Sequence, residues 1–219
     1  MNPHRTASHL PPILILLVMI APARAADPDP KELLEKALTA VGGQDKLLKL
    51  FQMRERLVLG ATVPPPPDPK EKGGRVSVLE PPANWWINKR DRGAEPAKFL
   101  VHAWTLGILV DPKSKLEALP AANIDGKAVN GLRVSGSVTP PLEMYFDAKE
   151  HRLLAIDWRN DRHVFSEWKK TEDGLWYASR AVGFKFTNAK SKTLAKNQWY
   201  QTDILELTRL KELPMGLER

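Results

Sequence analysis

Two neighbouring stretches, GLRVSGSV at residues 131–138 and LEMYF at residues 142–146, decide the fold class of this chain. In the first, Leu132 and Val134 alternate with polar residues, and in the second an apolar residue occupies every other position from Leu142 onward. A period of two gives a strand one apolar face. The connection between the stretches is too short for a parallel crossover, so they predict an antiparallel pair of strands.

The same pattern extends along the chain in both directions. Alternation begins after Phe51, and we expect further strands at residues 75–79, 84–90, 99–110, 115–119, 152–159, 163–171, 175–186 and 197–207. Short turn signals such as Asp125-Gly126 and Asp173-Gly174 separate these strands. The sequence therefore predicts one large, strongly curved antiparallel sheet.

A helical segment precedes the sheet. From Lys31 the apolar residues are three and four positions apart, and Gly42-Gly43 is a strong stop because glycine adopts the left-handed conformation that closes a helix. A second short helical piece is expected at residues 45–51. The predicted fold class is thus α+β, with an N-terminal helix or helical hairpin packed in the concave face of the sheet.

Residues 1–25 have the features of a cleavable signal peptide. A basic segment without acids, an apolar run at residues 13–20 and small residues at Ala23 and Ala25 occur in the order that a signal peptidase recognises. The run is shorter than the roughly 20 apolar residues that a membrane span needs. We therefore expect cleavage after Ala25, a single domain at residues 26–219, and a periplasmic or extracellular location.

Composition narrows the function. The chain has no cysteine, which excludes disulfides, thiolate metal sites, a cysteine nucleophile and a lipid anchor on cysteine. The formal net charge of +7 becomes +5 without Arg5 and Arg24, and the basic residues are interleaved with acids. We therefore expect no nucleic-acid partner and no stable membrane insertion.

Signals for catalysis are weak. His102, His151 and His163 lack metal-ligand spacing, and the chain has no G-x-S-x-G, P-loop or G-x-G-x-x-G motif. Asp157 and Asp161 could pair with His163, but a histidine and two carboxylates on one hairpin are ordinary surface chemistry. We expect a non-catalytic protein without a metal site or a cofactor.

A proline-rich segment at residues 64–74 interrupts the strands. Prolines in series hold an extended conformation and cannot donate to a sheet ladder. Since no docking motif flanks it, the segment is interpreted as a stiff exposed loop. The alternative is a docking peptide, in which Pro65 and Pro66 contact a partner.

Seven tryptophans are many for a domain of this size. Because Trp85 and Trp86 are adjacent, they must point to opposite faces of a strand. One indole then belongs to the interior. The other, for which we take Trp86, is either exposed to a partner, a membrane interface or a sugar ring, or covered by a loop such as the proline-rich segment.

A sheet with one apolar face needs something to cover that face. One helical hairpin covers only part of it, so the interior is either filled by side chains or hollow and open to a lipid tail or another apolar ligand. The candidate cavity residues are Leu38, Leu57, Trp85, Trp104, Leu132, Val134, Met144, Phe146 and Trp158.

Three segments resemble one known family. KALTAVGGQDKL at residues 36–47 is similar to the opening motif of exported lipoprotein-carrier-like proteins, the LolA/LolB/RseB-type superfamily. DGKAVNGLRV at residues 125–134, continued by PLEMYFD at residues 141–147, resembles its hairpins, and DGLWYA at residues 173–178 resembles a later turn. The resemblance implies an incomplete barrel closed by helices, with an apolar cavity that binds acyl chains.

Two hypotheses for the function follow. The preferred one is an exported carrier or binder of lipid or lipoprotein acyl chains, with the ligand held in the hollow of the curved sheet. The alternative is an envelope sensor or protein-interaction module that binds a protein partner through an exposed tryptophan and the proline-rich segment. A carbohydrate-binding domain is a third reading of the same tryptophans.

Overall fold

The alternating stretches form strands in the computed structural model, which describes residues 29–68 and 72–219. The expected signal peptide lies outside these residues. The strands are β1 (Phe51–Leu59), β2 (Arg75–Glu80), β3 (Asn84–Ile87), β4 (Arg90–Asp91), β5 (Lys115–Ile124), β6 (Lys127–Ser135), β7 (Leu142–Asp147), β8 (Leu153–Trp158), β9 (Asp161–Lys170), β10 (Trp176–Asn188), β11 (Thr193–Leu194) and β12 (Tyr200–Arg209). The helices are α1 (Pro30–Ala40) and α2 (Ala97–Trp104), with single 3₁₀ turns η1 (Gln44–Lys46) and η2 (Gly107–Leu109).

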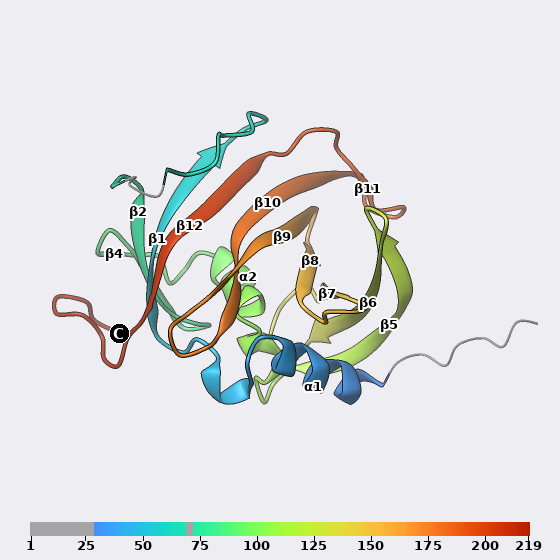
Figure 1. The fold of residues 1–219 in the computed structure, drawn as a ribbon, viewed down its shortest axis with the longest axis horizontal. Helices are drawn as coiled ribbons and strands as arrows, with labels where there is room; N and C mark the ends of the chain where they lie inside the picture. The colour runs from blue at the N-terminus through green and yellow to red at the C-terminus, as the bar shows by residue number, and fades with distance from the viewer. Residues whose placement is uncertain (1–28, 69–71) are drawn as a thin grey trace, which may run out of the picture.

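Within the described residues, all twelve strands belong to one sheet, in the order β4-β3-β2-β1-β12-β10-β9-β8-β7-β6-β5, with β11 beside β10. Neighbouring strands are antiparallel, and the last strand, β12, lies between β1 and β10. Figure 1 shows this sheet curving around α2 without closing, while α1 lies across one end of the half-barrel. The predicted fold class is confirmed.

The first helix begins and ends where the sequence indicates. The carboxylate of Asp29 caps it by accepting a hydrogen bond of 3.0 Å from the amide of Lys31. After the helix, Gly42 has a φ of +109°, and a Cβ atom there would lie 2.8 Å from the carbonyl oxygen of Gly174. Glycine is therefore required where this turn meets the β9–β10 turn. The expected second helical piece is reduced to η1, because β1 already begins at Phe51.

One predicted strand is wrong. Residues 99–110 form most of α2 and the turn η2 instead of a strand. The stretch contains apolar residues on nearly every side, so its sequence shows no period of two and no clear helical stripe. The helix packs inside the curve of the sheet, where both its faces meet apolar groups (Figure 1). None of the described helices is long and apolar enough to cross a membrane.

One half of the interior is tightly packed. Leu132, Val134, Met144 and Phe146 of β6 and β7 are at most 1% exposed and lie in one core cluster with Leu38 of α1. Here α1 packs against β5 and β6 and supplies the cover that the concave face of these strands needs. This half of the barrel is filled by side chains, which leaves the other half for a site.

Candidate functional site

A cavity of about 480 Å³ occupies the other half of the interior, between α2 and the concave face of the sheet. Most of its wall is apolar, and it opens to solvent at one end. The lining residues are Met53, Glu55, Leu57, Leu59, Arg75, Trp85, Glu95, Pro96, Ala97, Leu100, Val101, Trp104, Trp158, Arg159, Asp161, His163, Phe165, Ala178, Ala181, Trp199, Tyr200, Thr202 and Ile204. A pocket of this volume lies in the range of roughly 300–1,000 Å³ that small-molecule sites occupy.

Short side chains leave this space empty. Ala178 and Ala181 face the cavity from β10, where a larger residue would reach toward the helix. On the opposite side, α2 presents one face to the cavity, from Ala97 in its first turn to Trp104 at its end. The cavity therefore exists because the inward-pointing residues of β10 are small, and not because the sheet has a gap.

The mouth of the cavity is marked by its exposed lining residues. Leu59 at the end of β1, Pro96 and Ala97 at the start of α2, and Arg159 after β8 are all exposed. The guanidinium of Arg159 lies 4.4 Å from the ring centroid of Trp158, in cation–π contact. Glu95, just before α2, is also an exposed lining residue, so the entrance combines apolar surface with a cationic and an anionic group.

A buried ion pair lines one side of the cavity. Glu55 is 2% exposed and accepts a hydrogen bond of 2.8 Å from the hydroxyl of Ser77. The Nε atom of Arg75 lies 2.9 Å from the same carboxylate. Glu55 is the one acidic residue among the inward-facing apolar residues of β1, and its charge is balanced by Arg75, as a buried charge requires.

His163 and Tyr200 form a second polar spot. Their Nδ1 and hydroxyl oxygen are 2.8 Å apart, and the ring of Tyr200 lies where a side chain at Gly183 would be, since a Cβ there would be 2.0 Å from Tyr200 Cε1. Burial lowers the pKa of His163 to about 4 and raises the pKa of Tyr200. Both groups are uncharged at neutral pH, so they offer hydrogen bonds without adding a charge to the wall.

The structure brings four of the nine candidate cavity residues together. Leu57, Trp85, Trp104 and Trp158 line the cavity. The other five, Leu38, Leu132, Val134, Met144 and Phe146, are inward-facing as expected but lie in the packed half. Sequence reasoning missed the contribution of Leu100, Val101 and Ala181. No periodic signal in the sequence identified the first two, because the segment of α2 is apolar around most of its surface.

The partner-surface candidates have different outcomes. Trp86 does not line the cavity and is only 4% exposed, so of the two alternatives the exposed indole is wrong and the covered indole is confirmed. None of the described residues of the proline-rich segment, 64–68 and 72–74, belongs to the apolar cluster that contains Trp86. Apolar residues of the C-terminal segment, Leu210, Leu213 and Leu217, pack over it.

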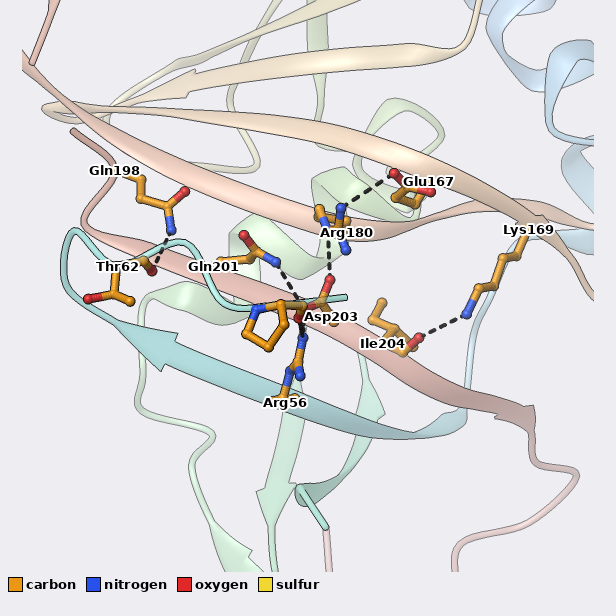
Figure 2. A network of polar contacts seen from close by, with 10 residues as sticks. Arg56, Thr62, Glu167, Lys169, Arg180, Gln198, Gln201, Asp203 and Ile204 are labelled. Atoms are coloured by element: carbon orange, nitrogen blue, oxygen red, sulfur yellow. Dashed lines mark hydrogen bonds and ion pairs between the residues drawn. The ribbon is translucent and has the colours of Figure 1, made fainter. Parts of the chain in front are cut away.

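The described start of the proline-rich segment, residues 64–68, is held against β1 through Pro65, and Pro65 and Pro66 are exposed. The carbonyl of Pro65 accepts a hydrogen bond of 2.6 Å from Arg56, and the carbonyl of Thr62 accepts one of 3.1 Å from Gln198. Figure 2 shows the neighbouring network, in which Asp203 accepts hydrogen bonds from Arg56, Arg180 and Gln201.

Burial alone would raise the pKa of Asp203, but these hydrogen bonds outweigh burial and hold it below its usual value. The network thus fastens β1, β10, β12 and the start of the proline-rich segment together on the side opposite the cavity (Figure 2). Across the described residues, no group of three or more His, Asp and Glu side chains could hold a metal ion.

Comparison with known proteins gives matches at the level of structure alone. No protein-family model and no curated protein matches the chain. A putative outer membrane lipoprotein-sorting protein domain from Vibrio parahaemolyticus is similar with a TM-score of 0.47 and 11% identity, over 84% of this chain and 94% of that one. A LolA superfamily protein from Nitrosomonas europaea has a TM-score of 0.48 and 11% identity, over 85% and 96% of the two chains. A DUF1329 family protein from Desulfovibrio piger has a TM-score of 0.48 and 12% identity, also over 85% and 96%.

Proposed function

We propose that this protein binds the acyl chain of a lipid or lipoprotein in the cavity beneath α2 and serves as its carrier. The observation that supports the proposal most directly is the cavity itself, about 480 Å³ of mainly apolar space with an open mouth. Removing apolar surface from water stabilises a complex by about 25 cal/mol per Å². A flexible hydrocarbon chain can fill a mainly apolar cavity whose lining carries few polar groups.

The polar groups in the wall fit this reading. The carboxylate of Glu55 already has Arg75 and Ser77 as partners, and His163 is hydrogen-bonded to Tyr200. The Glu55 carboxylate is paired and the His163–Tyr200 pair is uncharged, so an apolar ligand can lie beside them without leaving a bare charge. Because burial makes His163 a weak base and keeps Tyr200 protonated, we propose a binding role for this pair, not a catalytic one.

Lipid binding has better support than the alternative of a protein-interaction module. That alternative drew on an exposed indole, and Trp86 is buried beneath the C-terminal segment. We further propose that the chain is exported, is cleaved after Ala25 and works in the periplasm or outside the cell. N-terminal sequencing of the protein recovered from the cell envelope tests the export proposal, and an intact Met1 in that fraction would count against it.

The first experiment is native mass spectrometry of the protein purified from its own cells under mild conditions. A mass excess that matches a phospholipid, a fatty acid or a lipid-modified peptide would support the proposal and identify the cargo class. A bare mass, together with no uptake of a fluorescent fatty acid, would overturn it.

A further inference from the structure

One indole separates two hollows. Trp104, the last residue of α2, lines the main cavity and also a second hollow of about 10 Å³ on its other side. The second hollow is walled by aromatic and aliphatic side chains that include Val41, Trp168 and Trp176. At this volume it holds about one water molecule, so no chain enters it while the indole is in place.

Contacts on several sides hold the indole in position. Its Nε1 atom donates a hydrogen bond of 3.1 Å to the carbonyl oxygen of Ala178. Its ring centroid lies 6.3 Å from that of Phe51 and 6.4 Å from that of Tyr177, the second contact being edge-to-face. A hydrogen bond and two aromatic contacts restrict rotation of the side chain, so Trp104 is a fixed part of the wall.

The helix gives the cavity a direction. Ala97, the first residue of α2, is exposed at the mouth, and Trp104 lies at the far end of the same helical face. At 1.5 Å per residue, about 10 Å of helix separates them. A chain that enters at the mouth and runs along α2 therefore meets Trp104 with its terminal carbons.

We infer that Trp104 is the residue that determines the length of acyl chain the cavity accepts. This inference rests on the proposed function and adds to it a selectivity for chain length. Methylenes up to the indole are buried, and further methylenes remain outside the mouth in water. Removing the indole joins the two hollows and lengthens the space toward Trp168 and Trp176.

The test is displacement of a fluorescent fatty acid by unlabelled saturated fatty acids of increasing chain length, with the purified full-length protein. For the wild type, affinity rises about fourfold with each added methylene until the chain reaches Trp104, and then stops rising. In Trp104→Ala the rise continues to longer acids by several methylenes. We call the chain length at which affinity stops rising the break. In Trp104→Phe, which keeps a ring, the break stays close to that of the wild type.

Trp158→Ala is the matched control, because it removes an indole from the same cavity at a distance from the second hollow. It weakens binding of all chain lengths and leaves the break where it is. An unmoved break in Trp104→Ala would overturn the inference while leaving lipid binding intact. Failure of every fatty acid to displace the probe from the wild type would instead remove the proposed function.

A measurement on the wild type covers the case in which the Trp104 variants do not fold. A fatty acid of the length at the break carries a photoreactive diazirine on its terminal carbon and is cross-linked in place. Labelling of Trp104, Phe51 or Ala178 supports the inference. Labelling of Leu59 or Arg159 at the mouth overturns it, since the terminal carbon would then lie at the wrong end.

Discussion

At the scale of single residues, the buried His163 shows how the cavity wall affects stability. Its imidazole is uncharged in the folded protein because burial lowers its pKa to about 4, whereas in the unfolded chain the pKa is near 6.5. Between these values the unfolded state binds more protons, so stability falls as the pH falls from about 6.5 toward 4. His102 is also buried, and burial lowers its pKa against the opposing effect of Asp111, so it contributes in the same direction.

The variant His163→Gln isolates this effect. From neutral pH to pH 5, the wild type should lose about 2 kcal/mol more of its free energy of unfolding than the variant does. Urea denaturation of both proteins at the two pH values measures the difference. Equal pH dependence in the two proteins would show that His163 does not titrate on unfolding as its burial implies.

Gly183 is a second residue that the site requires. A Cβ atom at this position would lie 2.0 Å from the ring of Tyr200, so Gly183→Ala must displace that ring and weaken its contact with His163. We expect a loss of about 1–3 kcal/mol in the free energy of unfolding, as for other overpacked cores. Gly126→Ala is the control for loss of glycine, because nothing lies within 4 Å of a Cβ there and its effect comes from its positive φ alone. A Gly183→Ala variant as stable as the wild type would contradict this packing.

At the scale of elements, most strands and the first helix could be predicted from sequence, whereas two covering segments, α2 and the C-terminal segment, could not. The alternation of Leu132 and Val134, repeated in the next strand, is a local signal, and β6 and β7 form where it occurs. The segment of α2 lacks such a signal because it is apolar around most of its surface. Its place inside the sheet depends on contacts with strands far away in the chain, and a single sequence does not encode these contacts locally.

The C-terminal segment is the clearest case of a cover that sequence reasoning missed. Leu213 packs against the apolar cluster that contains Trp86, whereas Met215, two residues further on, is 94% exposed. We expect Leu213→Asp to lower the free energy of unfolding by about 1–3 kcal/mol, because it places a charge against the indole. It should also increase binding of a dye that fluoresces on exposed apolar surface.

Met215→Asp is the matched control and should change neither quantity. Urea denaturation and dye fluorescence of the two variants test whether the C-terminal segment covers Trp86. If Leu213→Asp resembled Met215→Asp, the C-terminal segment would not be the cover of Trp86 in solution.

At the scale of the whole molecule, the half-barrel has one filled half and one hollow half. In the filled half, α1 packs against β5 and β6, and in the hollow half, Ala181 faces the cavity beneath α2. Sequence alternation identifies which side chains point inward in both halves. It does not show which half is empty, because that depends on the summed volume of side chains brought together from distant strands. The candidate cavity residues were therefore divided between the two halves.

A hollow kept by small residues lacks the packing contacts that larger side chains would supply, and in the proposed function this space is left for the ligand. Ala181→Leu adds apolar atoms to the cavity, where they gain contacts that the alanine lacks. We expect this variant to raise the melting temperature by a few degrees and to abolish uptake of a fluorescent fatty acid, because core filling stabilises proteins by about 0.5–2 kcal/mol. Val182→Leu, at the next position on β10, points to the convex face and should leave uptake unchanged. Loss of uptake in both variants would mean that the strand, and not the cavity, had been disturbed. Retained uptake in Ala181→Leu would place the ligand outside the space beneath α2, since a chain and a leucine side chain cannot occupy the same volume.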